Sequence, residues 1–402
     1  MSGSRRANQA IDWLFVHLIA GELVGMMLIY KPFTTIGQQI DLLKSRGVVF
    51  SDELKAMEIL EREGYYSVVN GYKNPFLESK NSNKYVQGTK FEHIYYLFKF
   101  DRELRSIIFA ATTRAEALLR SSCSYCFSQM HENEVNAYLN ETNYEDLKES
   151  RGLIKAFNRI IENNTSNNQK LNTGKEYIRH CINNHDGQVP LWVLSNDLSF
   201  GQMFWFYKAQ TRCVRGLVAK KYTELYNSSH RSQKDITSIK IDSTYRRIKE
   251  FRNICAHDER LYCARPHSSN ATVFQLIKDF DLFLETNYYL EFLEKIEKLF
   301  SSLCNEVPNC SKNVIECIGM SSIYEFYDWK NKIKENITLN SNLPVPNEAT
   351  LKAMNHANQI MNGKISETVL FLATRMKLKH FWIICHENVT NIIRESRNSS
   401  QC

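Results

Sequence analysis

Glycine and proline are scarce in this chain of 402 residues, which contains 15 glycines and 7 prolines. Both residues interrupt regular structure, so their scarcity favours long helices over many turns. The sequence shows no internal repeat and no series of segments in which apolar and polar residues alternate, as they would in half-buried strands. The sequence therefore predicts an all-α fold.

Paired cysteine spacings are also missing. The chain has 11 cysteines, an odd number, which argues against a disulfide framework and favours a reducing cytoplasm. Cys123 and Cys126 lie in a predicted helix without a second pair, and Cys304, Cys310 and Cys317 have no histidine at ligand spacing. We therefore expect structural cysteines, no metal site and no cofactor.

A long uninterrupted apolar run is absent near the N-terminus. Residues 11–30 are rich in Leu, Ile, Val and Met, but Asp12 and Glu22 interrupt them. A charge at mid-membrane costs about 2.5–3.5 kcal/mol, so we expect a short buried helix and no membrane contact. Two alternatives stay open: a signal peptide or anchor, and a translation start at Met26 or Met27.

Helical periodicity and capping residues place most of the helices. Thr34 or Thr35 can cap a first helix with Gln38 closing a capping box, and Ser51 can cap a second that stops at Gly64. Later helices are predicted at about 91–130, 203–225, 242–262 and 274–303. The sequence Leu-Pro-Val-Pro at 343–346 is typical of a linker. We divide the chain into an N-terminal extension (1–30), a helical core (31–330) and a C-terminal helical appendage (331–402).

Arg252 and His257, five positions apart, suit RNA cleavage without a metal ion. The 2′-hydroxyl must lose a proton before its oxygen attacks the adjacent phosphorus. Histidine titrates near neutrality and can act as general base or acid. Arginine offers a planar, permanently charged fork to phosphate oxygens and can stabilise charge in the transition state. On a helix that continues to Tyr262, Asn253, His257 and Arg260 share one stripe.

The spacing alone is weak evidence, because the segment from Arg375 to His380 repeats it. The flanking residues are more specific. The sequence Arg-Asn-x-x-Ala-His from Arg252 to His257, followed by Arg-Leu-Tyr at 260–262, resembles the signature of HEPN ribonucleases.

Further blocks, in the same order along the chain, resemble abortive-infection (Abi) proteins that protect bacteria against phage. They comprise Lys31-Pro-Phe33, Gln39, Leu42, Leu43, Arg46-Gly47, Gly64-Tyr-Tyr66, Gly71-Tyr72, Phe100-Asp-Arg-x-Leu-Arg105, Glu116-x3-Arg120, Trp192 and Leu198-Ser-Phe-Gly201. The resemblance covers about residues 31–262, and it implies a HEPN-like helical bundle with additional helices.

The resemblance also implies roles for single residues. HEPN domains cleave RNA without a metal, often as dimers in which two Arg/His motifs face each other across one cleft. Arg252 and His257 take the catalytic roles here, and Asn253 matches the polar position after the arginine. Glu116 and Arg120 resemble a pair that lies close to the catalytic helix. Their alternative is an exposed ion pair within one helix, worth about 0.3–0.5 kcal/mol.

A net charge of +7 and a basic region close to the motif favour a polyanionic partner. The candidate RNA-binding residues are Arg212, Arg215, Lys220, Lys221, Arg246, Arg247 and Lys249, whose alternative is an ordinary solvated face. We therefore predict a metal-independent endoribonuclease of abortive infection, a toxin-like homodimer that cleaves RNA and could also bind a companion structured non-coding RNA. The alternative is a HEPN-like module in the same defence setting that binds a structured RNA without cleaving it.

Overall fold

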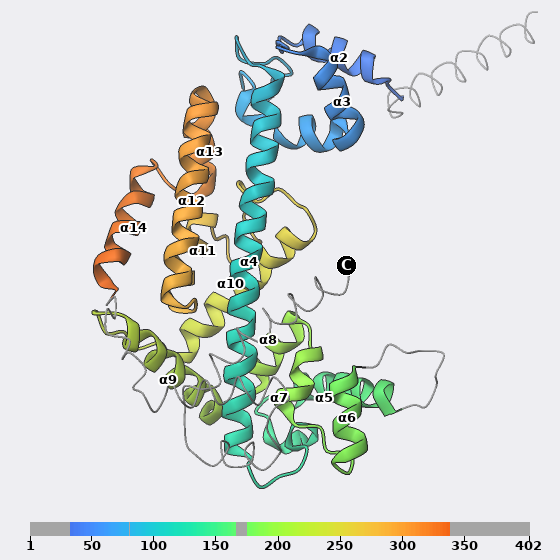
Figure 1. Ribbon diagram of the computed structural model, residues 1–402, viewed down its shortest axis with the longest axis vertical. Helices are drawn as coiled ribbons and strands as arrows, with labels where there is room; N and C mark the ends of the chain where they lie inside the picture. Colours follow the sequence, from blue (N-terminus) through green and yellow to red (C-terminus); the bar gives the residue numbers. More distant parts are fainter. Residues whose placement is uncertain (1–32, 80, 166–174, 338–402) are drawn as a thin grey trace, which may run out of the picture. The chain divides into compact units, whose positions relative to one another are not determined.

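The computed structural model describes residues 33–79, 81–165 and 175–337, which belong to one compact unit (Figure 1). The described residues contain α-helices, short 3-10 and π turns and four isolated β-bridges, and no strand among them is longer than a bridge. The prediction of an all-α fold is confirmed. The α-helices are α2 (Ile36–Ser45), α3 (Glu53–Glu63), α4 (Phe91–Met130), α5 (Leu147–Thr165), α6 (Glu176–Asn184), α7 (Leu191–Leu194), α8 (Phe200–Ala209), α9 (Arg212–Ser229), α10 (Ser238–Ala256), α11 (Val273–Asp279), α12 (Thr286–Glu306), α13 (Pro308–Ile318) and α14 (Tyr324–Asn336).

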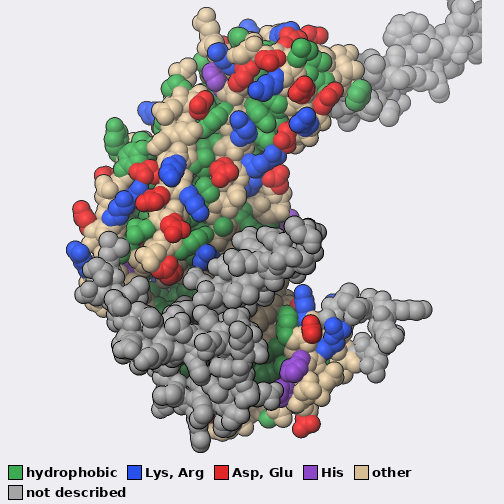
Figure 2. All heavy atoms as spheres, viewed as in Figure 1, with side chains coloured by type: hydrophobic (Ala, Val, Ile, Leu, Met, Phe, Trp, Pro, Cys, Tyr) green, Lys and Arg blue, Asp and Glu red, His purple; other side chains and the backbone are tan. Residues whose placement is uncertain are grey.

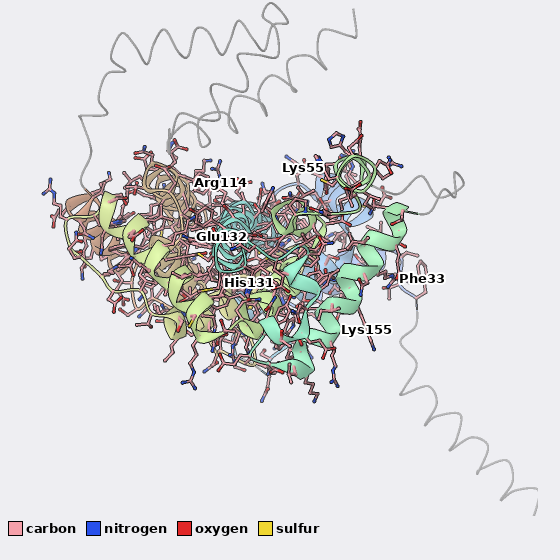
Figure 3. The ribbon with its side chains drawn as sticks, turned by 90° about the horizontal axis from the view of Figure 1, so that it is seen from below. Phe33, Lys55, Arg114, His131, Glu132 and Lys155 are labelled. Carbon is pink, nitrogen blue, oxygen red and sulfur yellow. The ribbon has the colours of Figure 1, made fainter. Side chains whose placement is uncertain are left out.

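Helix α4 organises this unit. It has 40 residues and is therefore about 60 Å long. Helices α7, α8, α9, α10 and α12 all pack against it. Figure 3 looks along α4 from the end marked by His131 and Glu132 and shows the other helices arranged around it. Ile94, Leu104, Ile108 and Leu119 recur at helical spacing on one broad face of α4, and all four are fully buried. Burial of this face along the length of the helix explains why α4 forms the centre of the core.

Local capping signals explain several helix ends. The Thr35 side chain and Gln38 form the predicted capping box at the start of α2, and α3 ends at Gly64, whose positive φ of 81° favours glycine. The prediction that Ser51 caps α3 is wrong, because the Asp52 carboxylate accepts the capping hydrogen bond from Lys55 N–H. A carboxylate accepts this bond at least as well as a hydroxyl group.

Three predicted helices differ from the structure. The segment 203–225 is divided between α8 and α9, because Gln210 is extended and the Thr211 side chain caps a new helix. The segment 274–303 is divided between α11 and α12. The segment 242–262 begins earlier, at Ser238, and ends at Ala256. The predicted domain boundary between 330 and 331 falls within α14.

The surface of α12 to α14 carries both signs of charge. On the described part of the face shown in Figure 2, Lys and Arg side chains are interspersed with Asp and Glu side chains. Mixed charge is typical of an ordinary solvated surface. This part of the face therefore gives no reason to expect a polyanion there.

Candidate RNA-cleaving site

His257 lies at the C-terminal end of α10. Its backbone N–H donates to the carbonyl oxygens of Asn253 and Cys255, which makes it the C-cap residue. The chain then turns at Asp258, which has a positive φ of 55°. The side chain of His257 is exposed, and none of the interactions among the described residues involves its imidazole. The imidazole is therefore accessible to a substrate.

A buried carboxylate fixes the loop that follows His257. Asp101 of α4 is fully buried and accepts hydrogen bonds from the backbone N–H groups of Leu261 (3.0 Å) and Tyr262 (2.7 Å). It also accepts from Arg105 (2.7 Å) and the Tyr72 hydroxyl (2.8 Å). Burial raises the pKa of Asp101, and these donors oppose that shift by stabilising the carboxylate. We call these five residues the Asp101 cluster.

Arg105 extends the same anchoring towards the motif. Its side chain is 5% exposed and donates to Asp258 Oδ1 (2.6 Å) and to the Glu259 carbonyl oxygen (3.2 Å). Arg105 therefore binds the two residues immediately after His257. Asp101 and Arg105 thus form a buried structural ion pair that anchors the segment after the candidate catalytic histidine.

The predicted stripe of Asn253, His257 and Arg260 does not form. Arg260 lies beyond the end of α10, and its side chain donates to the Gly71 carbonyl oxygen at 2.8 Å. The prediction was wrong because it extended the helix to Tyr262. The hydrogen bonds that Asp101 accepts from two backbone N–H groups favour an irregular loop there. Arg260 thus ties the loop to the segment before α4.

Arg252 lies on the last turn of α10, above an aromatic ring. Its guanidinium carbon is 5.9 Å from the centre of the Phe109 ring, which is 37% exposed. Its Nη1 donates a long hydrogen bond (3.4 Å) to Asn253 Oδ1. Its Nε is buried and has no partner among the described residues. Arg252 has no carboxylate partner among the described residues, so its charge is free to bind an anion.

Glu116 and Arg120 form an ion pair of 2.8 Å on α4, with 12% and 21% of their side chains exposed. Arg120 also donates to the Leu198 carbonyl oxygen, next to Ser199, the capping residue of α8. The pair is thus more buried than the exposed pair considered from the sequence. Glu116 lies seven residues from Phe109, about 10 Å along α4. The described hydrogen bonds of Glu116 and Arg120 join them to each other and to the Leu198 carbonyl oxygen, not to the motif.

Most of the predicted RNA-binding residues have carboxylate partners. Arg247 binds buried Asp279 (2.6 Å) and Arg246 binds Asp242 (2.8 Å). The remaining pairs are Arg212 and Arg215 with Glu145 (3.4 and 3.3 Å) and Lys220 with Glu224 (4.0 Å). Lys221 lies 4.1 Å from the centre of the Tyr125 ring, and Lys249 lies near the Phe204 and Trp205 rings. These residues occupy α9 and α10 and do not form a single cluster.

The cysteines fit the structural interpretation. Cys123 and Cys126 are buried and free, and burial raises the pKa of the Cys123 thiol. Among the described residues, no group of three or more His, Cys, Asp or Glu side chains could hold a metal ion. Arg375 and His380, which repeat the motif spacing, lie outside the described residues, as does the apolar run at 11–30.

The sequence analysis did not single out three residues that lie near side chains of α10. Phe109 lies under Arg252, and Trp205 of α8 lies beside Lys249 and Lys208. A signal was present in the sequence, because Trp205 and Lys208 are three residues apart and therefore on one face of a helix. The contact of this face with α10 depends on the packing of α8 against α10, which a linear pattern cannot show.

The all-α fold and the anchored Arg/His motif place the chain among helical proteins with a candidate anion-binding site. The model of the family described as Abi-like protein matches residues 58–263. This match covers half of the chain, and the chain belongs to the Abi-like protein family. Family membership suggests a role in abortive infection. Comparison with curated proteins found no match, nor did comparison with solved structures. None of the described helices has the length and apolar character needed to cross a membrane.

Proposed function

We propose that this protein is a metal-independent endoribonuclease that acts in abortive infection. The observation that carries the proposal is the end of α10. An exposed imidazole at His257 and the guanidinium of Arg252, which has no carboxylate partner among the described residues, lie about one turn apart. The Asp101 cluster anchors the loop immediately beyond them. Buried anchoring of an exposed polar pair is typical of a site in which geometry matters.

In the proposed reaction, His257 accepts the proton of a ribose 2′-hydroxyl, and the 2′-oxygen attacks the adjacent phosphorus. The bond from phosphorus to the 5′-oxygen breaks, and this oxygen receives a proton from a second acid. The products are a 2′,3′-cyclic phosphate and a free 5′-hydroxyl. Arg252 binds the phosphate oxygens, on which negative charge increases during attack. Asn253 is exposed beside Arg252 and can donate a further hydrogen bond.

Cleavage should therefore persist in EDTA and leave a 2′,3′-cyclic phosphate or its hydrolysis product. The purified full-length protein would be incubated with labelled single-stranded RNA, with and without EDTA, and the product ends would be analysed by mass spectrometry. Equal rates and cyclic phosphate ends are expected. Loss of cleavage in EDTA would contradict the metal-independent mechanism. Specific binding without any cleavage would favour the non-catalytic RNA-binding module.

A homodimer would supply the second acid. Attack by a 2′-hydroxyl is fastest when one group accepts a proton and another donates one to the leaving oxygen. A two-fold interface repeats the same surface on both subunits, so a dimer built around α10 would bring two copies of His257 together.

Light scattering on RNA-free protein at micromolar concentration should therefore give the mass of a dimer. Subunits carrying His257→Ala should regain part of the activity when mixed with subunits carrying Arg252→Ala. The mixed dimer brings one His257 and one Arg252 into the shared cleft, but it lacks the second acid. Each variant mixed with itself is the control. A monomer that still cleaves RNA would contradict the dimer.

A further inference from the structure

An exposed tryptophan of α8 contacts two lysines, one of them on α10. Trp205 of α8 is 38% exposed. Lys208 Nζ lies 4.9 Å from the centre of its ring, and Lys249 Nζ of α10 lies 5.5 Å from the same ring. Helices α8 and α10 pack directly against each other (Figure 1). The contact between an indole and two ammonium groups therefore joins two elements of the fold.

Lys208 and Lys249 have no carboxylate partner among the described residues. The ion pairs within 4.0 Å in this region involve other cations. Arg246, one turn before Lys249, is paired with Asp242. The charges of Lys208 and Lys249 therefore remain available to a ligand. Lysine has a flexible four-carbon stem, so its ammonium group can exchange the ring for a phosphate without movement of the backbone.

Trp205, Lys208 and Lys249 lie at a distance from the candidate catalytic residues. Lys249 lies one turn before Asn253 and eight residues before His257, about 12 Å along the helix axis. On its other side, Lys208 lines a hollow together with Glu145, Asp146, Leu147 and Arg215. An extended ligand at His257 could continue over Lys249 and Trp205 as far as Lys208, at the edge of this hollow.

We propose that Trp205, Lys208 and Lys249 bind single-stranded RNA on one side of the cleaved phosphate, farther along the strand. One unpaired base stacks on the indole, and the two ammonium groups bind flanking phosphates. This inference rests on the proposed function and adds a substrate class, unpaired RNA, to it. An aromatic ring beside basic side chains is the usual arrangement for single strands. Lysine is depleted at protein interfaces, which favours RNA over a second copy of the chain as the occupant.

The test uses the full chain with His257→Ala, so that RNA stays intact. Anisotropy of a labelled single-stranded RNA would give the dissociation constant with and without Trp205→Ala. Loss of one stacked base should weaken binding by about 5- to 150-fold, and Trp205→Phe should restore most of the affinity. Trp192→Ala is the matched control, since Trp192 of α7 is 59% exposed and has no lysine against its ring among the described residues. Unchanged affinity in Trp205→Ala would overturn the proposal.

A second pair of variants tests the cluster without touching the tryptophan. Lys208→Gln and Lys249→Gln together should reduce the slope of log affinity against log salt by about 1.4, the value for two phosphate contacts to a single strand. The slope should be unchanged in Lys44→Gln, where the lysine is paired with Glu53 and lies outside the candidate RNA-binding residues. An unchanged slope in the double variant would contradict the phosphate contacts.

Two further outcomes separate this inference from the proposed function. Binding that depends on Trp205, in a protein that never cleaves RNA, would support the RNA site and refute the ribonuclease. Cleavage that requires His257 but is unchanged by Trp205→Ala would support the ribonuclease and refute the RNA site at Trp205. A Trp205→Ala variant that loses dimer mass while its RNA affinity is unchanged would identify the occupant as a second copy and overturn the proposal.

Discussion

Replacement of His257 by alanine is expected to abolish RNA cleavage, with a rate loss of about 10²–10⁴-fold, the usual contribution of a general acid or base. The substitution should leave the fold intact, because His257 caps α10 through its backbone N–H and its side chain is exposed. The measurement is the single-turnover cleavage rate of a labelled RNA, with far-ultraviolet circular dichroism as the check on folding. Growth inhibition in cells should disappear together with cleavage.

Arg252→Ala should lower the same rate by about 10²–10³-fold, as expected for loss of one group that stabilises transition-state charge. Arg252→Lys should recover part of the rate, since lysine retains the charge but not the planar fork. His380→Ala is the matched control: it disrupts an Arg-x4-His spacing that lacks the flanking Asn, Ala and Arg-Leu-Tyr residues. Wild-type cleavage by His257→Ala, or complete loss of cleavage in a folded His380→Ala protein, would contradict the assignment.

Asp101→Asn is expected to lower the free energy of unfolding by about 3–5 kcal/mol, the range for removing one partner of a buried ion pair. The substitution retains the shape of the side chain but removes its charge and one acceptor oxygen. Arg105 would then remain buried with exposed Asp258 as its carboxylate partner. Urea unfolding should show a lower midpoint with an unchanged slope. Cleavage should also fall, since the loop after His257 loses an anchor.

Glu63→Gln is the control for this variant. It removes a bidentate ion pair with Arg102, the residue next to Asp101, at 3.0 and 2.8 Å. The Arg102 side chain is 49% exposed, so solvent screens the pair and its loss should cost no more than about 1 kcal/mol. Similar unfolding midpoints for Asp101→Asn and Glu63→Gln would mean that the Asp101 cluster does not anchor the loop.

Local signals in the sequence predicted most of the helices. The bounds of α4 follow from an apolar pattern that continues without glycine or proline, and Gly64 marks the end of α3. The C-terminus of α10 could not be predicted in this way. The sequence from Ala256 to Tyr262 contains neither glycine nor proline, and the helix ends there because Asp101, more than 150 positions away, binds the loop. Helix propensity is a weak determinant when a tertiary contact competes with it.

The candidate site stays a prediction. The flanking residues predicted the pair Arg252 and His257, and the structure gives a physical reason for several of those flanking residues. Gly71 and Tyr72, Asp101 and Arg105, and the Arg-Leu-Tyr sequence at 260–262 all meet around one loop. The roles of the basic residues depended on partners that a linear pattern cannot show. Arg247 looks like a surface cation in the sequence but binds buried Asp279.

Helix α4 fixes the relative orientation of two contacts that lie far apart along it. Asp101 and Arg105 hold the loop beyond α10, and Arg120, farther along the same helix, holds the Leu198 carbonyl before α8. Inserting or deleting one residue between Asp101 and Arg120 would turn one anchor by about 100° relative to the other. The two anchors could then no longer engage together. Length changes in Abi-like relatives should therefore fall outside this span, however far their sequences diverge within it.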